Sequence, residues 1–293
     1  GFLPSTGTLR HLRLPEPSAH VRVDTGVEQG DSITPFYDPM IAKLIVWDVD
    51  RDAALARMRQ ALADCQVVGV TTNAGFLRRL LFTDSFAQAE LDTALIEREQ
   101  AALEAGTHAD DSAWLLAAVA AVASTPAAAA DARDRHSPWQ QQDGWRIGAA
   151  APRVVHLQHG EQRHVLKVWT QPDGWQVQRD DQAMQPLNGT VADGLLTLQI
   201  DGQRHSVQVL RDGDQLHLFG RDGQQRFTLH DPVGESEQAV ADAGSLLAPM
   251  PGRIVATLVA DGTVVKRGTP LLVLEAMKME HTLQAPADGT VKG

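Results

Sequence analysis

The sequence predicts a multidomain α+β chain, in which an α/β segment is followed by a helix with an antiparallel β-barrel and then by a short β-sandwich. Strand-like and helix-like hydrophobic patterns alternate through residues 1–104. Asp-Gly and Asn-Gly pairs recur between residues 140 and 230, a pattern typical of antiparallel hairpins. Near the C-terminus Ala248–Val255 is echoed by Ala285–Lys292, and such a repeat indicates a domain built from two similar halves.

Composition excludes two classes of function. The net charge of −11 over 293 residues argues against nucleic-acid binding, which needs a basic surface. The longest apolar run, Ala113–Ala123, is shorter than the roughly 20 residues that a membrane-spanning helix needs. Cys65 is the only cysteine, so we expect no intrachain disulfide, and we expect the protein to work in the reducing cytoplasm of a bacterium.

The first segment predicts alternating strands and helices. Acidic residues around Arg51 open a helix that runs to about Asp64, with Leu55, Met58 and Leu62 on one face. The other expected elements are a strand over Ile41–Trp47, a short strand or turn over Val67–Val70, a helix over Ala74–Phe82 capped by Asn73, and a helix over Thr93–Glu104.

The middle segment predicts an antiparallel barrel. A polar linker, Ala105–Ser112, precedes the apolar helix Ala113–Ala123, which we expect to be buried because it is apolar on every side. We expect a barrel of about eight strands, with this helix packed on it or through it. The residues followed by Gly, which predict its turns, are Asp143, Asp173, Asn188, Asp193, Asp201, Asp212 and Asp222.

The C-terminal segment contains the main candidate site, Lys278, in a short polar stretch between hydrophobic strands. A lone lysine between two methionines is usually a solvated turn residue without chemical function. The internal repeat reverses that interpretation, because it places Lys278 where a hairpin would join the two halves. We therefore expect Lys278 to be presented for covalent modification.

The motif Ala276-Met277-Lys278-Met279, preceded by Pro249–Gly252, resembles the biotinyl domains of biotin-dependent carboxylases. The resemblance implies that Lys278 carries covalent biotin and that Ala276, Met277 and Met279 form the flanking recognition motif. A lipoyl carrier domain also presents a hairpin lysine, but its turn typically has an acidic residue before that lysine. A non-catalytic assembly module is the other alternative, and mass spectrometry of Lys278 distinguishes the three.

The N-terminal segment extends the resemblance. Val21–Asp24, Pro35–Ile45 and Thr72-Asn73 are similar to the C-terminal part of a biotin carboxylase domain. The resemblance thus implies residues 1–104 as that part, 105–230 as a helix-plus-barrel docking domain, 231–245 as a linker, and 246–293 as an incomplete biotinyl domain. This order resembles the α subunit of an acyl-CoA carboxylase.

Within that family the chain most resembles 3-methylcrotonyl-CoA carboxylase, through Glu280–Thr282 and Leu91–Arg98. Geranyl-CoA carboxylase is an alternative, whereas propionyl- and acetyl-CoA carboxylases resemble this chain less. The implied activity is that of a ligase in leucine degradation, in which ATP and bicarbonate carboxylate biotin and the carboxyl group passes to 3-methylcrotonyl-CoA. The implied partners are a carboxyltransferase β subunit that binds the acyl-CoA, further α subunits, and biotin protein ligase.

The resemblance implies that the residues binding ATP and Mg or Mn precede Gly1, so we expect a fragment of a longer protein that has no catalytic residues and no activity alone. Arg22 is a weak candidate for a catalytic arginine, since its motif position lies nearer a carboxylase dimer surface. Asp38 and Lys43 are expected to be structural, and Thr93 to lie near the adenine pocket. For His156, His159 and His164, on strands that would point them in different directions, no metal site is expected.

Overall fold

The computed structural model describes residues 5–36, 38, 40–105, 108–124, 151–231, 248, 252–276 and 279–292. The chain divides into two compact units. The first contains residues 1–47, 66–73 and 237–293, and the second contains residues 48–65 and 74–236. The domain boundaries predicted near residues 104, 230 and 246 depend on changes in sequence composition, and they stay predictions.

The N-terminal part of the first unit contains three two-stranded antiparallel sheets. β3 (Val21–Thr25) pairs with β5 (Ala42–Val46), which is the strand expected over Ile41–Trp47. The other pairs are β1 (Gly7–Thr8) with β4 (Ser32–Ile33), and β2 (His11–Arg13) with β6 (Gln66–Val68). β6 confirms the strand expected near Val67, and the chain leaves it at Gly69, where an added Cβ would lie 1.8 Å from a backbone oxygen of Thr8.

The first helix of the second unit, α1 (Arg51–Asp64), has the limits that the sequence predicts. The Asp50 side chain caps it by accepting a hydrogen bond from the Ala53 amide at 2.8 Å. Leu55 and Leu62 are buried, and α1 thus has the expected apolar face.

α2 (Ala74–Leu80) is two residues shorter than the sequence predicts, and α3 (Asp84–Ala87), which follows it, is not predicted from the sequence. The next two helices are α4 (Leu95–Arg98) and α5 (Gln100–Ala105). The single helix expected over Thr93–Glu104 is wrong, because Glu99 interrupts it with φ −94° and ψ 7°. The Glu99 carboxylate accepts a short hydrogen bond from the Ser85 hydroxyl on α3. A contact between residues 14 positions apart leaves no trace in hydrophobic periodicity.

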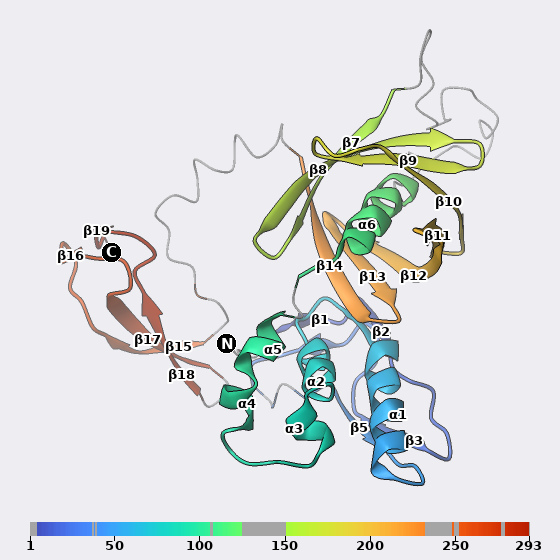
Figure 1. Ribbon diagram of the computed structural model, residues 1–293. Helices are drawn as coiled ribbons and strands as arrows, with labels where there is room; N and C mark the ends of the chain where they lie inside the picture. Colours follow the sequence, from blue (N-terminus) through green and yellow to red (C-terminus); the bar gives the residue numbers. More distant parts are fainter. Residues whose placement is uncertain are drawn as a thin grey trace. The chain divides into compact units, whose positions relative to one another are not determined.

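The largest structure in the second unit is a closed antiparallel barrel of eight strands around α6 (Asp111–Ala123), as Figure 1 shows. The expected barrel is confirmed, and the helix passes through it: ten consecutive residues of α6, Ala113–Val122, are buried. The strands are β7 (Arg153–His159), β8 (Gln162–Gln171), β9 (Gly174–Arg179), β10 (Gln185–Ala192), β11 (Leu195–Ile200), β12 (Gln203–Asp212), β13 (Gln215–Gly220) and β14 (Gly223–His230).

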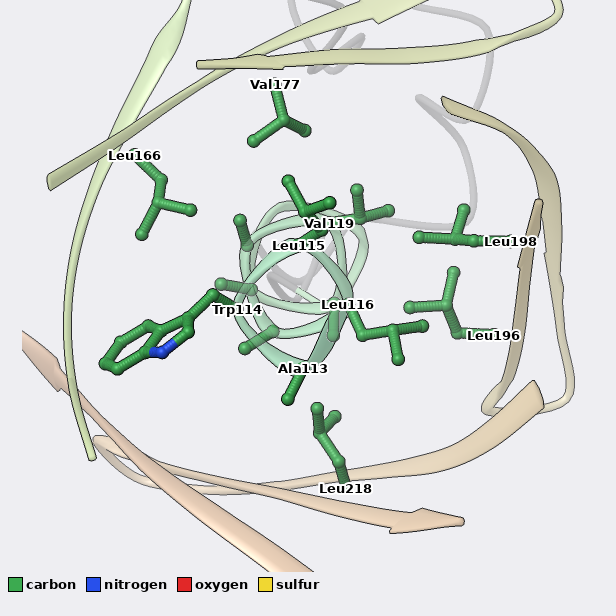
Figure 2. Packing of buried hydrophobic residues seen from close by; sticks show 14 of the residues in the cluster. Ala113, Trp114, Leu115, Leu116, Val119, Leu166, Val177, Leu196, Leu198 and Leu218 are labelled. Carbon is green, nitrogen blue, oxygen red and sulfur yellow. The ribbon is translucent and has the colours of Figure 1, made fainter. Parts of the chain in front are cut away.

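The helix fits inside the barrel because most of its side chains are small. In Figure 2, leucines and a valine from several strands surround α6 and point toward it, among them Leu166, Val177, Leu198 and Leu218. All four are at most 1% exposed. Since alternate residues of a strand point to opposite faces, each strand supplies its inward set to this one core.

The predicted hairpin turns hold in part. Asp193-Gly194 has φ values of 50° and 75°, and Asp201-Gly202 has 50° and 78°, as a type I′ turn requires. The prediction is wrong for Asn188, which lies with Gly189 inside β10. A Cβ at Gly189 would lie 2.1 Å from the Thr197 carbonyl oxygen on β11, so this glycine allows close strand packing instead of a turn. The turn expected at Asp143 lies outside the described residues.

The C-terminal part of the first unit has two small antiparallel sheets, in agreement with the expected sandwich type. In one sheet the strand order is β15 (Arg253–Thr257), β17 (Pro270–Ala276), β18 (Met279–Gln284). In the other sheet β16 (Val264–Val265) pairs with β19 (Gly289–Thr290). Among the described residues of the whole chain, no helix has the length and apolar character needed to span a membrane.

Candidate functional site

The candidate site is the hairpin of β17 and β18. From the pair Leu272–Leu283 onward the two strands stay in register to the end of the hairpin, where Glu275 pairs with Glu280 and Ala276 with Met279. Met277 and Lys278, which lie outside the described residues, are the two residues that join them. The side chains of Ala276 and Met279 are likewise not described. The register therefore restricts Lys278 to a two-residue connection between paired strands, the commonest length for a hairpin.

The hairpin is anchored by the central strand of its sheet. β17 pairs with β15 on one side and with β18 on the other. Leu274, two residues before Ala276, is 3% exposed and packs with Leu272, while Leu271 belongs to a second small core with Val265 and Ala285. Alternate residues of β17 thus enter different cores, which fixes the strand leading to Lys278.

The second segment of the repeat is held by matching backbone hydrogen bonds. The Gly268 amide donates to the Ala285 carbonyl at 2.9 Å, and the Ala285 amide donates to the Thr269 carbonyl at 2.9 Å. In the same way the Gly262 amide donates to the Val291 carbonyl, and the Val291 amide donates to the Thr263 carbonyl, both at 2.9 Å. The second segment of the sequence echo therefore pairs with residues 262–269, whereas the first segment pairs with β17 through β15.

The end of the hairpin carries exposed charges. Glu275 is the register partner of Arg253 on β15 and of Glu280 on β18, and all three side chains are exposed. Like charges directly opposite each other on a sheet are destabilising, whereas opposite charges stabilise it. Glu275 and Glu280, the last residues described with side chains on either side of Lys278, are thus open to solvent.

The secondary candidates have surroundings of their own. Arg22 forms an exposed ion pair with Asp24 at 2.8 Å, and the hydrogen bond between them raises the pKa of the guanidinium. Lys43 is the register partner of Asp24, and Thr93 is exposed just before α4. No bound group tests the roles expected for Arg22, Asp38 or Thr93, and these stay predictions.

Two of the three histidines have a different environment from the one expected. His159 and His164 were expected to point in different directions, but both rings lie near Trp114 of α6, with centroids at 6.4 and 4.6 Å. His164 Nδ1 lies 2.5 Å from an Asp180 carboxylate oxygen. Within the described part of the chain, no group of three or more His, Cys, Asp or Glu side chains could hold a metal ion. These histidines pack at one end of the barrel core.

Three protein-family models match the chain in succession. The biotin carboxylase C-terminal domain matches residues 1–98, and the methylcrotonyl-CoA carboxylase alpha-subunit BT domain matches residues 110–232. The model described as a biotin-requiring enzyme matches residues 244–293, which include the β17–β18 hairpin.

Similar proteins match nearly the whole chain. It is 35% identical over 306 residues to a mitochondrial methylcrotonoyl-CoA carboxylase subunit alpha of Dictyostelium discoideum, covering 99% of this chain and 44% of that protein. The corresponding subunit of Mus musculus is 33% identical, with 99% and 42% covered. A propionyl-CoA carboxylase alpha chain of Ruegeria pomeroyi is 31% identical, with 99% and 46% covered. The chain thus spans less than half the length of these curated relatives.

Proposed function

Because its successive segments belong to the biotin carboxylase C-terminal, methylcrotonyl-CoA carboxylase alpha-subunit BT and biotin-requiring families, we propose that this chain is the biotin-carrying portion of a methylcrotonyl-CoA carboxylase α subunit. The observation that carries the proposal is the position of Lys278, within a two-residue connection between strands paired to their last residues. The hairpin lies in the segment that matches the biotin-requiring family, which supports covalent attachment of biotin at this lysine.

Lys278 is the residue that bears the cofactor. Its long stem and terminal amine allow an amide bond to the carboxyl group of biotin, and the amide removes the positive charge of the side chain. Bound biotin supplies the chemistry of carrying a carboxyl group between two active sites, while the protein supplies placement. The core contacts of Leu274 and the pairing of Glu275 with Glu280 hold the strands on either side of the attachment point.

The acyl-CoA substrate is 3-methylcrotonyl-CoA. Support comes from relatives of 35% and 33% identity that are methylcrotonoyl-CoA carboxylase subunits, against 31% for the propionyl-CoA carboxylase chain. In the whole enzyme, bicarbonate would supply the carboxyl group and ATP with Mg or Mn would activate it, which places the reaction among the C–C bond-forming ligases.

The barrel with its central helix is the part that docks to a carboxyltransferase β subunit, the protein that binds the acyl-CoA. Its match to the BT domain of the methylcrotonyl-CoA carboxylase α subunit supports this assignment. Biotin protein ligase is the second partner, and it acts at the β17–β18 hairpin. We place the protein in a reducing bacterial cytoplasm, since its only cysteine, Cys65, is buried and unpaired with another cysteine.

The test is a carboxylation assay on protein isolated by avidin affinity from its own cells. Labelled bicarbonate should enter acid-stable product with 3-methylcrotonyl-CoA, in an ATP-dependent reaction that exceeds those with geranyl-CoA and propionyl-CoA. A chromosomal Lys278→Arg variant, which keeps the charge but cannot be biotinylated, should lose avidin retention, and its cell extract should lack the activity that the parent extract shows. Retained activity in that variant would overturn the carrier role; a preference for another acyl-CoA would overturn only the substrate.

A further inference from the structure

One barrel strand, β13, is buried on both faces. Leu216 and Leu218 point into the core and are at most 1% exposed. His217 and Phe219 alternate with them and so lie on the outer face, yet they are only 5% and 4% exposed. On β11 the residues that alternate with the core leucines, such as Leu195 and Gln199, are exposed. Part of the chain therefore covers the outer face of β13.

The covering element is α1, which packs against β13 and β14 within the same compact unit. One ring nitrogen of His217 has a hydrogen-bond partner in this buried position, since Nδ1 lies 3.0 Å from the Gln224 side-chain nitrogen on β14. The His217 and Phe219 rings are nearly parallel, with 13° between their planes and 6.3 Å between centroids. The outer face of β13 thus has the character of an internal packing surface.

A second contact lies at the turn between β13 and β14. Arg78 of α2 donates from Nη1 to the Asp222 carbonyl oxygen at 2.9 Å and from Nη2 to the Arg221 carbonyl oxygen at 3.1 Å. Its Nη2 also lies 3.7 Å from the Asp222 carboxylate, and its side chain is 17% exposed. Hydrogen bonds from a charged donor are stronger than those between neutral groups. One guanidinium therefore holds both carbonyls of this turn.

The Arg78 side chain is oriented by an aromatic contact. Its guanidinium carbon lies 5.1 Å from the centroid of the Phe82 ring. That ring also contacts Arg59 of α1, whose guanidinium carbon is 4.3 Å from the centroid and whose Nε donates to the Leu81 carbonyl at 3.0 Å. The two cations share one ring, so α1, α2 and the following segment present Arg78 in a fixed direction.

We infer that the outer face of β13 and the β13–β14 turn form a docking surface for helices α1 and α2 of the same chain, with Arg78 as the positioning residue. The hydrogen bonds of Arg78 to Arg221 and Asp222 identify these helices as the segment that binds the surface, although the bonded residues are more than 140 positions apart. The consequence is that the barrel and the helical segment before it keep one mutual orientation in solution. This inference is independent of whether Lys278 carries biotin.

The test measures that orientation by distances between spin labels. Cysteines replace the exposed Ala101 on α5 and the exposed Gln203 on the barrel, while the native Cys65 is buried. A second labelled pair, Asp181 and Gln203, lies entirely on exposed barrel positions and reports on barrel integrity. The parent protein should give one narrow distance distribution for each pair.

Arg78→Ala should broaden the distribution between α5 and the barrel while leaving the pair within the barrel unchanged. Arg221→Ala is the matched control, because that residue contributes only its backbone carbonyl, and it should behave as the parent does. Phe82→Ala, at a residue 53% exposed, should broaden the same distribution and provides a second variant should Arg78→Ala fail to fold. A broad distribution in the parent, or a narrow one in both Arg78→Ala and Phe82→Ala, would overturn the docking surface.

Discussion

The helix inside the barrel should depend on Trp114 more than on any other of its side chains. Trp114 is 1% exposed, and its ring meets His164 edge-on at 4.6 Å and Phe227 at 5.1 Å. Replacing a buried tryptophan by alanine costs about 3–5 kcal/mol in core packing. The two ring contacts each add about 0.5–1.5 kcal/mol beyond burial. We therefore expect Trp114→Ala to lower the free energy of barrel unfolding by about 4–8 kcal/mol.

Hydrogen exchange followed by mass spectrometry is the appropriate assay, since a chain with several units does not unfold in one step. Peptides from β8 and β14 should exchange much faster in Trp114→Ala. Trp47→Ala is the matched control: Trp47 is 59% exposed and its ring meets that of His20 at 4.6 Å, outside the barrel, so its loss should leave the barrel peptides unchanged. Unchanged barrel exchange in Trp114→Ala, or equal effects of both variants, would refute the reasoning.

Three further predictions follow from single side chains. In urea unfolding, Gly189→Ala should destabilise the barrel by more than Gly202→Ala does. A Cβ at Gly189 would clash with a backbone oxygen at 2.1 Å, whereas a Cβ at Gly202 would meet open space and cost only the strain of φ +78°, about 1–2 kcal/mol. An equal loss of stability in the two variants would contradict the strand-packing role of Gly189. Burial acts to raise the pKa of Asp180, but hydrogen bonds from the Val165 amide and His164 outweigh it, and the pKa lies below 3.8. The ionised carboxylate thus stabilises the fold above that pH, so the difference in stability between the parent and Asp180→Asn should shrink as the pH falls below about 3.8. A difference that grows would show that the pKa is shifted in the opposite direction. Burial raises the pKa of Cys65 from 9.0 to about 11, so its alkylation at pH 8 should be roughly a hundredfold slower than in urea; equal rates would contradict its burial.

The barrel could be predicted because its turns are local. In Asp193-Gly194 and Asp201-Gly202 the dipeptide itself demands positive φ, and both form the expected turns. Asn188-Gly189 has the same chemistry but lies within β10, where the strand beside it leaves no room for a Cβ. The neighbouring strand, and not the dipeptide, decided that position. The apolar helix could be placed in a core from its composition, and closure of the sheet around it supplied that core.

The helical segment before the barrel was harder to predict because distant contacts divide it. Glu99 ends α4 while its carboxylate contacts Ser85, and neither residue signals this in its neighbours. Arg78 is a similar case, since its partners lie more than 140 residues away. The hairpin around Lys278, in contrast, could be predicted from one short motif and one repeat, because the strands on either side carry their own apolar pattern.

The central claim is that Lys278 carries biotin, and tryptic peptide mass spectrometry of the protein from its own cells tests it most directly. Trypsin cannot cleave after a biotinylated lysine, so the modified protein should give one peptide from Gly268 to Lys292 that bears a single biotin. Unmodified protein would instead be cut after Lys278 into two peptides. Recovery of only those two peptides, or of a lipoyl group on Lys278, would contradict the account.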